Sequence, residues 1–177
     1  PGVDMYMEYN DNIYLDSDNE QDDVITTVTP NILMEWKTAR LDVSLFAAVT
    51  MEKYMDNTDE DRIGAGETNQ SSRLSALAKL YREVFFLKIT DTYSRVPIDE
   101  GGRGGESNRT VNLTDSNTLT INPYLNFPLM KNTQMRLGYT YTNQWYEEDE
   151  GNDYISHLYS VGLTNELSAR VTMTLSG

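Results

Sequence analysis

Hydrophobic and polar residues alternate one by one over long stretches of this chain. Such alternation is typical of a β-strand that has one apolar face and one polar face. The clearest example is residues 133–145, TQMRLGYTYTNQW, in which nearly every second residue is apolar or aromatic. Residues 118–129 and 41–52 repeat the pattern. Each of these stretches therefore predicts a strand with two chemically different faces.

Nine stretches with this alternation predict an all-β fold of nine long strands. Most of them are longer than the roughly 5 to 6 residues that are usual for a strand. Because the expected strands follow one another with only turns and loops between them, we expect a single domain, residues 1–177, folded as an antiparallel up-and-down meander. The expected strands span residues 2–14, 23–37, 40–55, 71–81, 84–97, 117–130, 133–146, 154–165 and 168–176.

The connections between the expected strands alternate between short and long. Consecutive antiparallel strands place alternate connections at opposite ends of a sheet, so the long connections should all lie at one end. Most of the 28 acidic residues fall in the long connections, whereas the short turns are mixed or basic. Short turns are expected at residues 37–40, 82–83, 131–132 and 166–167, and long acidic outer loops at about 14–23, 56–70, 98–116 and 147–153.

Charged residues occur along the whole length of the expected polar faces. A dry protein core could not hold so many charges unless nearly all of them were paired. The polar face is therefore expected to meet water. The charged residues expected on it are Asp4, Glu8, Glu35, Asp42, Glu52, Lys79, Lys88, Arg136 and Arg170.

A membrane-spanning helix is excluded, because the chain contains no run of about 18 apolar residues. A strand, however, can cross a bilayer with only about 9 to 11 residues, of which every second one is apolar. Short turns at one end, long loops at the other and a water-facing polar face together predict part of a transmembrane β-barrel. Its apolar face would contact lipid, and its polar face would line an aqueous lumen.

Aromatic residues lie near both ends of the expected strands. Transmembrane barrels carry two girdles of aromatic residues at the level of the lipid headgroups. Aromatic residues also favour strands in general, and that preference explains these positions equally well. The residues expected in the girdles are Tyr14, Trp36, Tyr54, Tyr81, Tyr93, Trp145 and Tyr154.

The start of the chain resembles a known family. Residues 9–15, YNDNIYL, are followed by an acidic stretch and then by residues 22–30, DDVITTVTP. Together they resemble the first hairpin of the β-barrel porin type 2 group, Gram-negative outer-membrane barrels with relatives associated with exopolysaccharide and exosortase systems. The resemblance implies an outer-membrane channel and carries over no catalytic residue.

The chain also departs from a complete member of that group. Single-chain bacterial barrels have an even number of strands, whereas nine are expected here. The chain ends at residues 175–177, LSG, without the terminal aromatic strand that outer-membrane barrels usually have. We therefore expect it to be an N-terminal half or fragment of a barrel with about 16 strands.

The acidic residues in the first long loop offer alternating oxygen ligands, which suit Ca²⁺. An EF-hand loop would need glycine at its sixth position, where this stretch has Gln21, and helices on both sides. Weak, delocalised binding of divalent cations is therefore expected, at Asp16, Asp18, Glu20 and Asp22.

No motif indicates catalysis or a cofactor. The single histidine, His157, is not framed by a nucleophile motif, and the absence of cysteine excludes disulfides and thiol chemistry. The glycine-rich residues 101–105 lack the lysine and flanking elements of a phosphate-binding loop. The net charge of -14 argues against a nucleic-acid partner.

Together these features predict a non-enzymatic porin or channel for small solutes in the outer membrane of a Gram-negative bacterium. Its expected partners are outer-membrane lipid, lipopolysaccharide and divalent cations. A conduit for exopolysaccharide export or for a periplasmic partner is an alternative within the same fold. An alternative from another class is a surface β-sheet adhesin or binding protein, whose apolar face would be a buried core. The sequence leaves the solute and the oligomeric state open.

Overall fold

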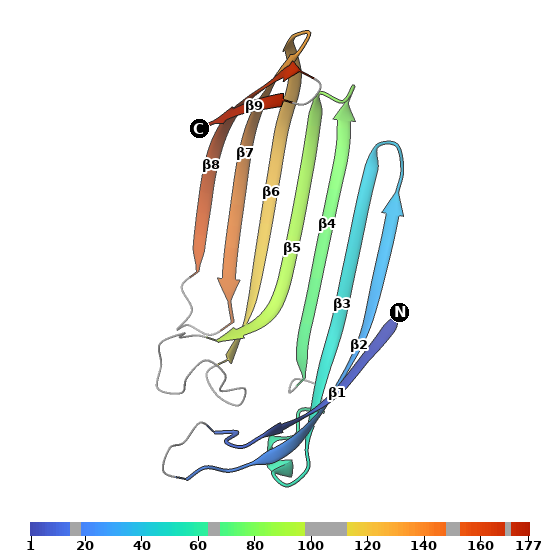
Figure 1. The fold of residues 1–177 in the computed structure, drawn as a ribbon, viewed down its shortest axis with the longest axis vertical. Coiled ribbons are helices and arrows are strands. Elements are labelled where there is room, and N and C mark those ends of the chain that lie inside the picture. Colours follow the sequence, from blue (N-terminus) through green and yellow to red (C-terminus); the bar gives the residue numbers. More distant parts are fainter. Residues whose placement is uncertain (15–18, 64–67, 98–112, 148–152, 169–170) are drawn as a thin grey trace.

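In a computed structural model that describes residues 1–14, 19–63, 68–97, 113–147, 153–168 and 171–177, the chain forms one sheet. Each strand pairs antiparallel with the strands before and after it in sequence, so the spatial order is β1 to β9 (Figure 1). The predicted all-β, up-and-down fold is confirmed. The strands are β1 (Gly2–Asn10), β2 (Asp23–Lys37), β3 (Leu41–Tyr54), β4 (Asn69–Tyr81), β5 (Phe85–Pro97), β6 (Leu113–Met130), β7 (Thr133–Tyr146), β8 (Tyr154–Ser168) and β9 (Val171–Ser176).

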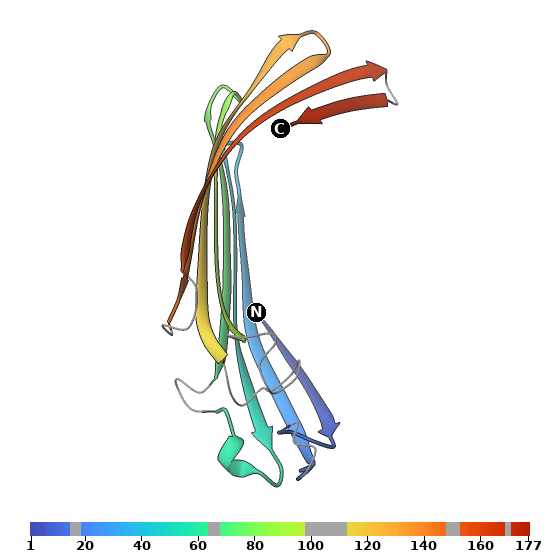
Figure 2. The ribbon, with the colours of Figure 1, turned by 90° about the vertical axis from the view of Figure 1, so that its left-hand side faces the viewer.

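The sheet is open along its two outer strands. Within the described residues, β1 pairs only with β2 and β9 pairs only with β8. Seen from the side, the sheet is curved, and the N- and C-termini lie on the same side of its middle strands (Figure 2). The seven inner strands have hydrogen-bonded neighbours on both sides.

The first strand is shorter than the alternation predicts and ends at Asn10 rather than at residue 14. The side-chain oxygen of Asn10 accepts a hydrogen bond from the backbone N–H of Asn12 at 3.0 Å, a local turn that asparagine readily forms. The chain then turns, and Ile13 is buried beside Ile25 and Tyr54. Ile13, which continued the apolar/polar alternation past Asn10, is therefore packed in the loop and is not part of the strand.

Further strand boundaries also differ from the prediction. β6 begins at Leu113 and not at residue 117, and β4 begins two residues early, at Asn69. β8 continues to Ser168 and β9 begins at Val171, so the predicted turn at residues 166–167 is wrong. Glu166 pairs with Thr172 in the ladder between β8 and β9. These extensions are rich in polar residues, and backbone pairing does not require an apolar side chain, so alternation could not reveal them.

Tight turns follow β2, β4 and β6 at one end of the sheet, and β1, β3, β5 and β7 end at the other (Figure 1). The connection after β3 contains a short 3-10 helix, η1 (Thr58–Glu60). Residues 15–18, 64–67, 98–112 and 148–152 of the expected acidic loops lie outside the described residues. The part of the chain that the structure describes contains no helix long and apolar enough to cross a membrane.

The register keeps the two faces of the sheet largely distinct in chemistry, although Leu77 lies on the polar face, and Asp91, Arg95 and Asp115 lie on the apolar face. In one row, Lys37 pairs with Asp42, Asp42 with Leu77, Leu77 with Lys88 and Lys88 with Asn122. Side chains in one row project from the same face. The polar face, so defined, carries Asp4, Glu8, Glu35, Asp42, Arg73, Lys79, Lys88 and Arg136, and the opposite, apolar face carries Met5, Met34, Leu45, Leu74, Leu87, Ile121, Leu137 and Val161.

Much of the apolar face is exposed. Met5 and Tyr159, at its two sides, are 67% and 76% exposed, and within the described residues only Ile13, Ile25, Ala48 and Tyr54 are buried hydrophobic residues. A large exposed apolar surface on a soluble monomer is unusual and marks contact with lipid or another protein.

Candidate functional site

The register brings most of the residues that were expected to face water onto the polar face. Eight of the nine expected residues lie on that face. The ninth, Arg170, lies outside the described residues. Because successive side chains of a strand point to opposite faces, a single continuous register is enough to align residues from six different strands.

Charges of opposite sign are largely separated on the polar face. The carboxylates lie on β1 to β3, together with Lys37. Arg73, Lys79, Lys88 and Arg136 lie on β4 to β7, where the described part of the polar face carries no carboxylate. Arg73 was not among the expected residues. Arg73 precedes Lys79 by six positions on the same strand, so the two side chains point to the same face. The alternation that identified Lys79 could therefore also have identified Arg73.

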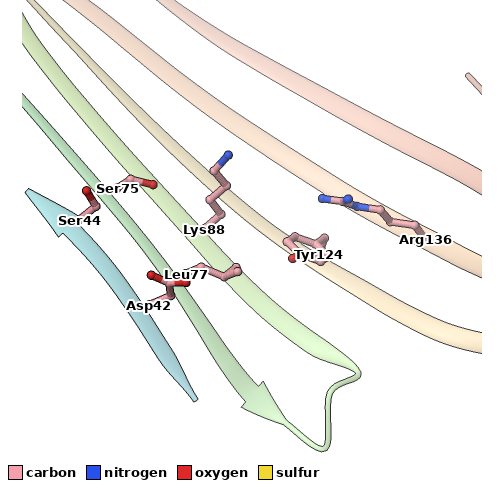
Figure 3. A pocket seen from close by; sticks show the side chains of 7 residues that line it. All are labelled: Asp42, Ser44, Ser75, Leu77, Lys88, Tyr124 and Arg136. Atoms are coloured by element: carbon pink, nitrogen blue, oxygen red, sulfur yellow. The ribbon is translucent and has the colours of Figure 1, made fainter. Parts of the chain in front are cut away.

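A hollow of about 400 Å³ lies on the polar face, in the half of the sheet nearer the tight turns. Small side chains make its floor, because Ser44 on β3 pairs with Ser75 on β4. Longer side chains surround this row (Figure 3). The residues that line the hollow are Asp42, Ser44, Ser75, Leu77, Lys88, Tyr124 and Arg136.

Aromatic stacking orders one side of the hollow. Phe86 on β5 and Tyr124 on β6 are register partners, and their rings stack with centroids 4.9 Å apart and an interplanar angle of 5°. The guanidinium carbon of Arg136 lies 3.8 Å from the centroid of the Tyr124 ring. Cross-strand aromatic pairs and cation–π contacts are each favourable by roughly 0.5 to 1.5 kcal/mol. The Arg136 side chain is therefore held in place over the sheet.

Glu52 lies on the polar face but is buried, with a relative exposure of 4%. Residues 58–62 fold back beside β3, so that Glu52 and Arg62 pair through both backbone hydrogen bonds. The Arg62 guanidinium lies 3.9 Å from the Glu52 carboxylate. The expectation that Glu52 lines open aqueous space is thus corrected, because a later segment of the chain covers it.

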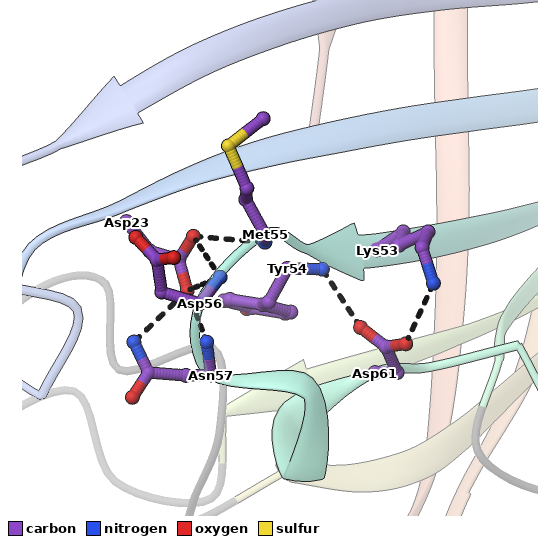
Figure 4. Close-up of polar contacts among 7 residues, drawn as sticks. All are labelled: Asp23, Lys53, Tyr54, Met55, Asp56, Asn57 and Asp61. Atoms are coloured by element: carbon purple, nitrogen blue, oxygen red, sulfur yellow. Dashed lines mark hydrogen bonds and ion pairs between the residues drawn. The ribbon is translucent and has the colours of Figure 1, made fainter.

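Asp23, at the start of β2, is buried and binds the chain just after β3. Its carboxylate accepts hydrogen bonds from the backbone N–H groups of Met55 (2.9 Å), Asp56 (3.2 Å) and Asn57 (2.8 Å), and from the Asn57 side-chain amide (2.9 Å) (Figure 4). Burial by itself raises the carboxyl pKa, but these donors outweigh it and lower the pKa of Asp23 to about 2. Asp23 is therefore a charged clasp that closes the first two loops together.

Other loop carboxylates act in the same way. Asp61 accepts a hydrogen bond from the backbone N–H of Tyr54 at 2.8 Å and pairs with Lys53 at 3.3 Å (Figure 4). Asp153 accepts one from the backbone N–H of Tyr146 at 2.8 Å. Part of the acid in the long connections therefore satisfies backbone donors at strand ends.

Two of the four expected cation-binding residues lie within the described residues. Asp16 and Asp18 lie outside the described residues. Glu20 and Asp22 are exposed, and Asp22 accepts a hydrogen bond from the Tyr9 hydroxyl at 3.0 Å. Within the described residues, no three or more histidine, cysteine or acidic side chains are grouped closely enough to hold a metal ion.

The expected girdle residues divide between the two faces. Tyr54 and Tyr154 lie on the polar face, and Tyr54 is only 1% exposed, so neither can belong to a girdle on the apolar face. Tyr14 lies after β1 and donates a hydrogen bond to Glu60 at 3.1 Å. Burial, together with that bond, raises the pKa of Tyr14. The girdle residues that lie on the apolar face are Trp36, Tyr81, Tyr93 and Trp145.

His157 lies on the apolar face among tyrosines. Its Nδ1 is 2.8 Å from the hydroxyl oxygen of Tyr139, and its ring lies 5.5 Å from that of Tyr141. These contacts describe an aromatic cluster at an exposed surface. They do not form the nucleophile, base and carboxylate series that acyl-transfer catalysis requires.

Comparison with known proteins adds no relative: no family model, no curated protein and no solved structure matches this chain.

Proposed function

We propose that this chain is part of an outer-membrane β-barrel of a Gram-negative bacterium, and that the barrel is a porin or channel for the passive passage of small solutes. One observation carries the proposal: an exposed apolar face lies opposite a charged, polar face across the sheet. In a barrel the first face would contact lipid and the second would line water. Closure of the sheet would also satisfy the backbone groups of its two outer strands.

The length of the apolar stretches supports a membrane contact. The apolar face of β6 extends from Leu119 to Leu129, and that of β3 from Leu41 to Met51. Ten residues of strand rise about 34 Å, which becomes about 26 Å after a tilt of about 40°. The apolar band of outer-membrane barrels is about 25 Å tall. The resemblance to the β-barrel porin type 2 group agrees with this function.

The first experiment tests the location of the protein. The chain should partition with outer membranes, require detergent for extraction after a urea wash, and migrate differently on a gel before and after heating. If a urea wash without detergent releases the protein from the membranes in soluble form, the barrel is refuted and a surface β-sheet binding protein is favoured.

The second experiment tests transport. The protein reconstituted in a planar lipid bilayer should conduct ions with an ohmic current–voltage relation. Absence of current in a correctly inserted protein would contradict a porin, and would favour a closed or structural barrel.

A further inference from the structure

We propose that the hollow on the polar face binds an oxyanion, the carboxylate or phosphate group of a small anionic solute, through Lys88 and Arg136. This inference deepens the proposed function and rests on it, because the hollow meets passing solutes only if the polar face lines a lumen. It assigns a solute class to the polar face.

The lining of the hollow carries several hydrogen-bond donors. The hydroxyls of Ser44 and Ser75 lie on its floor, and Lys88 and Arg136 project on the same side of the sheet (Figure 3). Hydroxyls and cationic N–H groups are the donors that bind carboxylate and phosphate oxygens. The lining therefore carries donors of the kind that an oxyanion binds, with Lys88 and Arg136 supplying the charge.

The charges around the hollow are unequal. Within the described residues, neither Lys88 nor Arg136 forms an ion pair, whereas Asp42, the carboxylate in the lining, is paired with Lys37 at 3.1 Å. Arg73 adds a further cation on β4, and Glu35, the register partner of Ser44, adds a carboxylate on β2. The field is therefore negative toward β2, whereas at Lys88 and Arg136, on β5 and β7, it favours an anion.

Arg136 is oriented for this role before any ligand arrives. Its guanidinium stacks over Tyr124, which is itself stacked on Phe86. A stacked guanidinium keeps its N–H donors in its own plane, where they can form two parallel hydrogen bonds to an oxyanion. Fixing the side chain in advance reduces the entropy lost on binding.

Charges at the far ends of the strands do not cancel this field. Lys88 is nine residues from the end of β5, or about 30 Å along the strand. The Debye length at physiological salt is about 8 Å, so charges at that distance are screened in water. The two ends of the proposed lumen can therefore have opposite preferences.

Equilibrium binding tests the site without requiring transport. The folded protein in detergent micelles is titrated with inorganic phosphate and, separately, with succinate, by calorimetry. We expect binding of both, and at least tenfold weaker binding by the double variant Lys88→Gln/Arg136→Gln. The matched control, Arg40→Gln/Lys131→Gln, removes the same two charge types from tight turns outside the hollow and should bind as the native protein does. Binding of phosphate alone would identify a phosphate site, and of succinate alone a carboxylate site.

Two results would overturn the inference: no binding of either anion by the native protein, or equal weakening in the two double variants. Conductance then separates the inference from the function. If the native protein conducts, phosphate should reduce its chloride current, and less so in the Lys88→Gln/Arg136→Gln variant. A protein that binds phosphate in micelles but carries no current keeps the anion site and refutes the porin.

Discussion

The burial of Asp23 shows how one carboxylate can hold two loops. Its partners lie at residues 55–57, more than thirty positions later in the chain, so no local pattern could have predicted the contact. In the sequence, Asp23 reads as the last member of an acidic stretch. In the structure Asp23 is 1% exposed, and its carboxylate accepts hydrogen bonds from backbone N–H groups.

Asp23→Asn should lower the free energy of unfolding by about 2 kcal/mol, the value that corresponds to a pKa lowered from 3.8 to about 2. Because the pKa is lowered in the folded state, this stabilisation is present above pH 4 to 5, roughly, and is lost as the pH falls through about 2. Urea titration in detergent at several pH values measures it. Asp22→Asn, at an exposed neighbour with one hydrogen bond to Tyr9, is the control and should change the free energy by less than about 0.5 kcal/mol. Equal effects of the two substitutions would contradict the clasp.

Arg95 and Asp115 form an ion pair whose two-hydrogen-bond geometry and burial distinguish it from the exposed ion pairs. They are directly opposite on β5 and β6, and the guanidinium forms two hydrogen bonds, Nε to Oδ1 at 2.8 Å and Nη2 to Oδ2 at 3.2 Å. Their side chains are 23% and 13% exposed, whereas those of the pair Lys37 and Asp42 are 81% and 49% exposed.

We expect Arg95→Gln to lower the free energy of unfolding by about 1 to 3 kcal/mol, because it leaves a half-buried carboxylate without its forked partner. Lys37→Gln, which breaks the exposed pair, should cost less than about 1 kcal/mol. Parallel urea titrations of the two variants test the difference. A loss for Lys37→Gln as large as that for Arg95→Gln would mean that burial does not decide the strength of these pairs.

At the scale of elements, alternation predicted the strands well where each strand has one apolar and one polar face. β2 and β7 begin and end at the expected residues. Alternation failed at Asn10, where a local side-chain hydrogen bond ends β1, and at Leu113, where β6 is polar on both faces. The signal reports side-chain burial, whereas a strand ends where backbone pairing ends.

The turn between β4 and β5 contains strained residues. Arg82 and Glu83 have φ angles of 42° and 58°, and the N–H of Val84 donates to the carbonyl of Tyr81 at 2.7 Å. Positive φ at both central residues is characteristic of a type I′ turn, which favours Asn-Gly. A side chain in this region costs about 1 to 2 kcal/mol per residue.

The double substitution Arg82→Asn/Glu83→Gly should therefore raise the free energy of unfolding by about 1 kcal/mol, after the greater freedom of glycine in the unfolded chain is deducted. The same pair of residues placed at Lys131 and Asn132, in the turn after β6, should give no gain, because neither residue there has a positive φ. Urea titration compares the two. A similar gain at both turns would show that the effect does not come from the φ angles.

At the scale of the whole molecule, the strand register accounts for both the polar face and the apolar face. Alternation placed the eight described charged residues on one face because parity decides which residues share a face, but it was wrong for Tyr54 and Tyr154. It could not predict the hollow, because the hollow depends on which strands are neighbours and which of their small residues meet, as Ser44 and Ser75 do. The burial of Glu52 likewise depends on a loop that returns to β3.

The opposite chemistry of the two faces makes adjacent residues respond differently to the same substitution. Ile121 lies on the apolar face of β6, between the end and the middle of its apolar stretch, and Thr120 lies beside it on the polar face. In a lipid bilayer, Ile121→Arg should lower the free energy of unfolding by about 1 to 3 kcal/mol, because the cost of a lipid-facing arginine falls from its midplane value toward the interface. Thr120→Arg, which places the same charge toward water, should cost less than about 1 kcal/mol. Urea titrations in vesicles, with folding followed by heat-modifiable gel migration, measure both values. Equal losses in the two variants would contradict a barrel with lipid on one face and water on the other.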